Sequence, residues 1–179
     1  MYGRIVGLLG ILIAAGGVTV ASAEQSRRSA IPPADAFSQR VLAEHNRERD
    51  RAGVPRLAWS DRLARDAEAW AQQLAGEGWL RHASRNENGG AGENLWMGSA
   101  GYYAPETMIA AFLEERRFYR HGTFPNVSRT GNWQDVGHYT QVVWRETREV
   151  GCAVARNARD DFLVCRYWPS GNWMGQVPF

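Results

Sequence analysis

Two cysteines, Cys152 and Cys165, constrain the fold of this chain more than any other feature. They lie in two β-prone runs, at 149–155 and 162–168, which a short polar segment separates. A hairpin that turns after Ala158 places the two cysteines opposite each other, within reach of a disulfide bond. The sequence therefore predicts a disulfide-closed antiparallel hairpin, a closure that stabilises by about 3 kcal/mol in the chain-entropy description. Two buried free thiols are the alternative.

A further β-prone run, VGHYTQVVW at 136–144, carries His138 near its start. Its density of Val, Tyr, Thr and Trp predicts a half-buried strand with His138 at the mouth. A side chain held rigidly there suits a metal ligand or a proton-transfer group. The alternative is a capping or core histidine at a strand end, because a single histidine is weak support for a site.

The N-terminal residues predict export. Residues 1–23 have the pattern of a signal peptide, with Arg4, an uncharged apolar run and a small-residue A-x-A site at 21–23. An uncleaved anchor over 5–23 is the alternative, because this stretch is nearly long enough to span a bilayer. Residues 24–34 are polar, contain two prolines and predict a linker. After cleavage no stable membrane span is expected, and a lone disulfide fits a secreted protein or, in a bacterium, a periplasmic one.

Length and charge restrict the class of protein further. The part after the leader, at 35–179, suits a single domain with a core of its own. The formal net charge is only +2, which gives no field for attracting nucleic acid, so we expect no nucleic-acid partner.

Helices are predicted in the first two thirds of this domain. Apolar periodicity and stop signals favour helices over 35–50, from Ser60 to Gly76, and over 106–120. The glycine-rich stretch at 79–101 predicts irregular structure, with either tight turns or close approach of the backbone to another element.

Glu115 is the acid that the helix pattern singles out. It follows Met108 and Phe112 and precedes Tyr119 at helical spacing, on one side of the third predicted helix. A carboxylate directed at the core is costly unless a cation, a metal or hydrogen-bond donors compensate it. The alternative is an acid at the edge of the stripe that pairs with Arg116 or another nearby arginine.

Several motifs, taken together, resemble those of one protein family. They are GHYTQVVW at 137–144, FLVCRYWPSGNW at 162–173, GENLW at 92–96, LRHAS around His82, and the opening pattern EHNRERDRAGVPRLAWSDRLARDAEAWA at 44–71. Over about 37–173 the chain resembles the CAP superfamily of cysteine-rich secretory proteins, antigen 5 and pathogenesis-related-1 proteins, also called the SCP domain. The resemblance implies an α+β fold, a three-layer α-β-α sandwich around a twisted, mostly antiparallel sheet.

The resemblance also implies a cleft that holds two histidines and two acids. Carried over motif by motif, these residues are His82 in RHAS, Glu93 in GENLW, Glu115 on the third helix and His138 in GHYTQ. Phe112 stands where the family commonly has tryptophan, a mild departure. Two neutral imidazoles suit Zn²⁺ or another divalent cation, and a nearby acid can hold a water or orient a ring. A polar network that braces the cleft without metal is the alternative.

The function that this resemblance implies is binding. The cleft would hold a divalent cation, and a lipid, a sterol or another extracellular ligand would dock in the cleft or between helices. One alternative is a structural or signalling module that meets an extracellular protein partner. Another is a metal-assisted hydrolase of peptide or cell-wall substrates, with the four cleft residues as catalytic groups. The sequence has no nucleophile motif such as G-x-S-x-G, which disfavours catalysis without deciding the matter. The other histidines, His45 and His121, are expected in the core and at a helix end, without a catalytic role.

Overall fold

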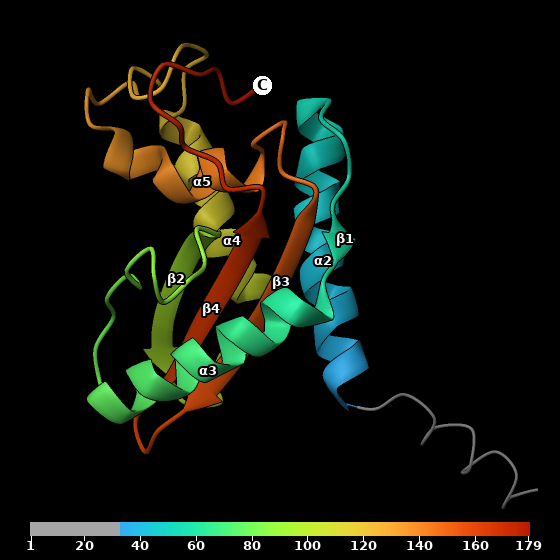
Figure 1. Cartoon of the computed structure of the whole chain (residues 1–179), viewed down its shortest axis with the longest axis vertical. Helices are drawn as coiled ribbons and strands as arrows, with labels where there is room; N and C mark the ends of the chain where they lie inside the picture. Colours follow the sequence, from blue (N-terminus) through green and yellow to red (C-terminus); the bar gives the residue numbers. More distant parts are fainter. Residues whose placement is uncertain (1–32) are drawn as a thin grey trace, which may run out of the picture. The chain divides into compact units, whose positions relative to one another are not determined.

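The computed structural model describes residues 33–179. The predicted signal peptide and all but the end of the predicted linker lie outside the described residues. The elements, shown in Figure 1, are α2 (Pro33–Ala52), β1 (Ala58–Trp59), α3 (Asp61–Glu77), β2 (Gly92–Ser99), α4 (Pro105–Glu114), η1 (Glu115–Phe118), η2 (Trp133–Val136), α5 (Gly137–Val142), β3 (Glu149–Arg156) and β4 (Asp160–Trp168). None of the helices described is long and apolar enough to cross a membrane.

A four-stranded sheet in the order β1-β3-β4-β2 separates two helical layers. β1 runs parallel to β3, whereas β3, β4 and β2 pair in antiparallel fashion. Helix α3 crosses one face of the sheet, and α2, α4 and α5 cover the other (Figure 1). The predicted α+β fold, a three-layer α-β-α sandwich, is confirmed.

Alternation along β4 builds a core on each face of the sheet, because successive side chains of a strand point to opposite faces. Leu163, Cys165 and Tyr167 pack with α2, α4 and α5, while Phe162 and Val164 pack with α3. Both layers therefore depend on this one central strand.

The predicted hairpin is confirmed with its register. Cys152 lies opposite Cys165 in the β3–β4 ladder and forms a disulfide with it, with the Cα atoms 4.1 Å apart. No free cysteine is left in the described residues, so the alternative of two buried thiols is excluded.

The strand predicted at 136–144 is wrong, because this segment forms η2 and α5. Val142, Val143 and Trp144 are at most 1% exposed although they are consecutive, so no polar face alternates with the apolar one. A short apolar run of this kind does not distinguish a helix from a buried strand by periodicity. Packing of Tyr139 and both valines into the cluster with α4 overrides the β propensity of the run.

The irregular structure predicted at 79–101 is also partly wrong, since its second half forms β2, an edge strand paired along its whole length with β4. Gly92 does not mark a turn here. A Cβ atom on it would lie 2.2 Å from Gln141 Oε1, so the glycine permits a close approach of β2 to α5.

The third predicted helix ends earlier than expected. Helix α4 begins at Pro105, one residue before the predicted start at 106, but its α-helical part stops at Glu114 and continues as the 3₁₀ turn η1. Glu115 therefore stands at the start of η1.

Candidate functional site

His82 and Glu93 form the first histidine–carboxylate pair of the candidate site. His82 lies between α3 and β2, and Glu93 is the second residue of β2. The ring Nδ1 lies 2.5 Å from Glu93 Oε1, which also accepts a hydrogen bond from the backbone N–H of Ala83 at 3.1 Å. Because a carboxylate oxygen only accepts, Nδ1 carries the ring proton, so in the neutral imidazole Nε2 holds the lone pair. The His82 side chain is 65% exposed and that of Glu93 only 4%.

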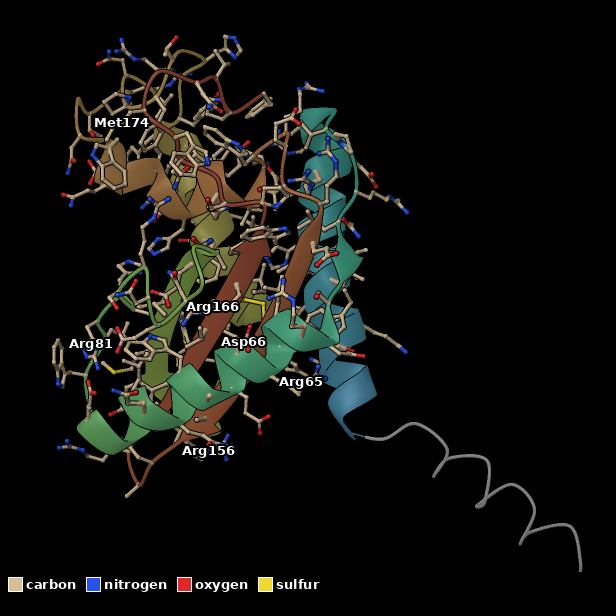
Figure 2. The ribbon with its side chains drawn as sticks, in the orientation of Figure 1. Arg65, Asp66, Arg81, Arg156, Arg166 and Met174 are labelled. Atoms are coloured by element: carbon tan, nitrogen blue, oxygen red, sulfur yellow. A yellow bond between two sulfur atoms is a disulfide. The ribbon has the colours of Figure 1, made fainter. Side chains whose placement is uncertain are left out.

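Arg166 lies beside this pair on the neighbouring strand. It is opposite Glu93 in the β2–β4 register, and its Nη1 forms an ion pair with Glu93 Oε2. The angles of this contact fall outside those of a directed hydrogen bond, although the two atoms are close enough for an ion pair. Burial lowers the pKa of Arg166, and the negative charge of Glu93 opposes that shift. Figure 2 labels Arg166 in the middle of the sheet, close to α3.

His138 and Glu115 form the second pair, from α5 and η1. His138 Nδ1 lies 2.6 Å from Glu115 Oε1, while Oε2 accepts the backbone N–H groups of His138 and Tyr139 at 2.9 and 3.1 Å. Phe112 stacks on the imidazole with ring centroids 5.0 Å apart. The core-directed carboxylate is thus compensated by three donors. Arg116, the alternative partner, instead pairs with an acid of α2.

One hollow of about 330 Å³ contains both imidazoles. Its lining residues are His82, Glu93, Asn94, Trp133, Gln134, Gly137, His138 and Asn172. Glu115 reaches this hollow through its bond to His138. The four residues singled out from the sequence are therefore brought together as two pairs, and in each pair Nδ1 is occupied while Nε2 stays available.

A series of buried hydrogen bonds connects the backbone of the second pair to α2. Asn94 donates from Nδ2 to the backbone carbonyl of His138 at 3.1 Å and to the Tyr167 hydroxyl at 3.2 Å. That hydroxyl donates to His45 Nε2 at 2.9 Å, and His45 Nδ1 donates to the carbonyl of Val41 at 2.8 Å. These hydrogen bonds engage both ring nitrogens of His45, which is a core residue, as expected.

Asn172 is a further support that the sequence analysis missed. Its backbone has a φ of 58°, which is rare outside glycine. Its side chain donates to the carbonyl of Gly137 at 2.9 Å and accepts the Thr140 hydroxyl at 2.7 Å. It therefore holds the first turn of α5, which carries His138.

The sequence contained a signal for Arg166 but not for Asn94 or Asn172. A charged residue inside the β-prone run FLVCRYW sits at a position whose neighbours are buried, and such a charge needs a partner. Asparagine at a strand or a turn is too common to indicate a buried bridge.

Another group of metal-type side chains does not suit a metal. Among the described residues, His45, Cys152 and Cys165 offer ligand atoms within 4.8 Å of one another. The two sulfurs are joined as a disulfide and cannot act as thiolates. Both nitrogens of His45 are also engaged, so this group is part of the core. His121 is exposed beyond η1, and its nearest aromatic neighbour is Phe179.

Comparison with known proteins gives concordant matches. The profile of the Cysteine-rich secretory protein family (CAP) matches residues 42–167. The chain is similar to the pathogenesis-related protein PRMS of Zea mays, with 38% identity over 144 residues that cover 79% of this chain and 81% of the relative. It is also similar to the pathogenesis-related protein 1A of Nicotiana tabacum, with 37% identity over 142 residues, 79% of this chain and 80% of the relative.

Solved structures agree with this match. The structure of NaASP2 with Zn²⁺ has a TM-score of 0.65 and 25% identity, and the match covers 80% of this chain and 84% of that one. The structure of BmVAL-1 has a TM-score of 0.67, with 84% of each chain covered. At 22% identity the likeness to BmVAL-1 concerns the fold alone.

Proposed function

The chain belongs to the Cysteine-rich secretory protein (CAP) family, and on that premise we propose that it is an exported binding protein whose cleft holds a divalent cation between His82 and His138. The observation that carries this proposal is the pair of Nδ1–carboxylate bonds, which leave Nε2 unbonded in two histidines that line the same hollow. A histidine that ligates a metal characteristically donates its other N–H to a carboxylate. Export agrees with the leader pattern, with the disulfide and with relatives named as pathogenesis-related proteins.

The residues present fit zinc as an open site. Two neutral nitrogens suit Zn²⁺, and NaASP2 is described with that ion. The two carboxylates are already engaged by their histidines and by other donors, so solvent or a ligand has to complete the coordination. A bound ion would attract anionic or carbonyl oxygens of such a ligand. The chain's own groups hold the two rings and fix which nitrogen faces the cleft.

Zinc binding is the direct test. We expect the purified mature protein to bind about one equivalent of Zn²⁺ in calorimetry, as two histidines in one cleft provide for a single ion. The double variant His82→Ala/His138→Ala should lose that binding, because both nitrogen ligands are gone. His121→Ala is the matched control, since it removes an exposed histidine outside the cleft. Equal zinc binding by the wild type and the double variant would refute the cation site.

We further propose that a lipid with a single acyl chain, such as a fatty acid, binds in a groove between α2 and α3. The groove has a volume of about 420 Å³ and lies at the edge of β3, where the two-residue strand β1 stops. Phe37, Trp59 and Val154 give it an apolar lining. Arg65 on α3 (Figure 2) also lines the groove, together with Asp61 and Glu68. It forms no ion pair with another described residue, so it is the one cation of the lining that can meet a carboxylate head group.

Filling the groove should abolish this binding. Ala64→Phe places a ring among the lining residues, so we expect at least a tenfold loss of affinity for a fluorescent fatty acid, consistent with the area of apolar contact displaced. Ala69→Phe on the exposed side of α3 is the control and should bind like the wild type. Undiminished binding by Ala64→Phe would place the lipid outside this groove.

Hydrolysis is less well supported than binding. The residues that line the hollow include no serine, threonine or cysteine, so no described lining side chain offers a hydroxyl or thiol nucleophile. Glu93 accepts from a histidine and one backbone N–H group, and Glu115 from a histidine and two, so both carboxylates already serve to orient the imidazole rings.

A further inference from the structure

The two histidine–carboxylate pairs are held in different ways. Glu115 Oε2 is fixed by two backbone N–H groups at the start of α5. Glu93 Oε2 instead faces a guanidinium, that of Arg166, and Oε1 serves both His82 and the backbone of Ala83. The second pair is therefore positioned by two main-chain donors, and the first by one main-chain donor and one charged side chain.

Arg166 is placed by the sheet itself. In the register of β2, β4 and β3, it lies between Glu93 on one side and Gly151 on the other. The glycine lets α3 come so close that a Cβ atom there would lie 2.3 Å from the backbone nitrogen of Ala64. The guanidinium is thus enclosed between the sheet and α3, 1% exposed and 6.0 Å from the centre of the Trp70 ring.

This burial is poorly explained by stability. Nε of Arg166 has no hydrogen-bond partner among the described residues, and the ion pair with Glu93 lacks hydrogen-bond angles. Buried ion pairs commonly contribute little to folding relative to apolar residues of the same size, since desolvation offsets the attraction. An enclosed arginine with incomplete hydrogen bonding is better explained by what it does to Glu93.

We propose that Arg166 is a positioning residue for His82. By holding Glu93 Oε2, it fixes the carboxylate so that Oε1 meets Nδ1 of His82, and the imidazole then presents the Nε2 lone pair to the cleft. This inference rests on the proposed cation site, which gives that lone pair its use. His82 itself is largely exposed, and no ring of residues 33–179 stacks on it as the Phe112 ring does on His138. The bond to Glu93 is therefore the main constraint on its tautomer and orientation.

The first test reads the tautomer of each imidazole in the metal-free protein. In the wild type, ¹⁵N NMR should show the Nδ1–H form for both His82 and His138. In Arg166→Met the carboxylate loses its anchor, so His82 should move toward the tautomer mixture of a free imidazole. His138 should keep its signal, because Glu115 does not touch Arg166. An unchanged His82 in a variant with intact His138 signals would overturn the proposal.

The second test is a double-mutant cycle on zinc affinity, measured in the whole mature protein. Loss of a residue that orients a metal ligand typically weakens binding about 10- to 100-fold, so we expect this loss in Arg166→Met. If Arg166 acts through Glu93, then Glu93→Gln and Glu93→Gln/Arg166→Met should bind zinc equally. A further loss in the double variant would show that Arg166 acts by another route. The double variant carries no unpaired buried charge, whereas each single variant leaves one partner buried without the other, so near-UV circular dichroism first establishes that each variant is folded.

Arg156→Met is the matched control. Arg156 also pairs across the hairpin with an acid, Asp161, whose side chain is 1% exposed. Figure 2 shows Arg156 at the far end of the sheet from Arg166. Zinc affinity and both imidazole signals should match the wild type in this variant. If the wild type itself binds no zinc, the cation site fails, while the tautomer test still decides the role of Arg166.

Discussion

Replacing Arg49 by methionine should lower the free energy of unfolding by about 3–5 kcal/mol, the cost typical of breaking a buried charged network. The Arg49 side chain lies in α2 and is fully buried. Its guanidinium donates to four backbone carbonyls, which are those of Pro55, Val142, Trp144 and Thr147, at 2.6 to 3.0 Å. Methionine fills similar space but leaves these acceptors in the core without their donors. Burial lowers the pKa of Arg49 to about 10, so the group is still charged at neutral pH.

Urea unfolding of Arg49→Met and of Arg47→Met measures this contribution. Arg47 lies in the same helix, is 72% exposed and pairs with an acid on the helix surface. An exposed pair of this kind is worth about 0–1 kcal/mol, so its loss should barely shift the midpoint. Equal midpoints for the two variants would show that the four carbonyls find other donors and that Arg49 is dispensable.

Arg49 also connects the scaffold to the cleft. Val142 is the last residue of α5, and Trp144 and Thr147 belong to the loop that leads into β3. The guanidinium therefore ties α2 to the end of the short helix that carries His138. A six-residue helix has too few internal hydrogen bonds to be stable alone, so its geometry depends on such tertiary anchors.

The sequence pattern correctly predicted the elements that depend on residues close together in the chain. The β3–β4 hairpin joins neighbouring runs across a short turn, so alternation and the turn position were sufficient to pair Cys152 with Cys165. The prediction failed at α5, where burial of every apolar side chain removes the alternation that would distinguish the two kinds of element. It also failed at β2, because its glycines serve close packing rather than turns.

The candidate site likewise contains residues that the sequence pattern identified and others that it did not. The helical spacing of Met108, Phe112 and Tyr119 correctly singled out Glu115, although Glu115 lies in the 3₁₀ turn η1. The spacing still applies because this turn continues the direction of α4 for a few residues. No spacing indicated that His82 and His138 face one hollow. That convergence depends on the crossing of β2 and α5, and only the family resemblance suggested it. Neither source indicated that Arg166 pairs with Glu93, since a cross-strand partner requires the register of the sheet.

His45 should make the protein acid-sensitive well above the range in which carboxylates titrate. Burial lowers the pKa of His45 from 6.5 to about 4, and the charge of Arg49 adds to the effect, whereas the carbonyl of Val41 opposes it. In the unfolded chain this imidazole binds a proton near its ordinary pKa. Between about pH 6.5 and pH 4 the unfolded state therefore binds more protons than the native state, and stability falls as pH falls. The difference in pKa corresponds to about 3 kcal/mol over this window.

The variant His45→Gln isolates this contribution. Glutamine cannot titrate, so the variant should be less stable than the wild type at pH 7 but should lose much less on acidification from pH 7 to pH 4. His121→Gln removes an exposed histidine and should follow the wild-type curve at every pH. The other polar groups that face the ring, Arg49 and the Tyr167 hydroxyl, do not change charge in this range, since burial keeps the pKa of Tyr167 far above it. Parallel curves for the wild type and His45→Gln would show that His45 is not the acid-sensitive group.

Protonation of His45 also affects the cleft, because Nε2 then no longer accepts the Tyr167 hydroxyl. That hydroxyl accepts a hydrogen bond from Asn94, which also donates to the backbone carbonyl of His138. Acid should therefore disturb the second histidine of the cleft through its buried support, even though that histidine lies on another element.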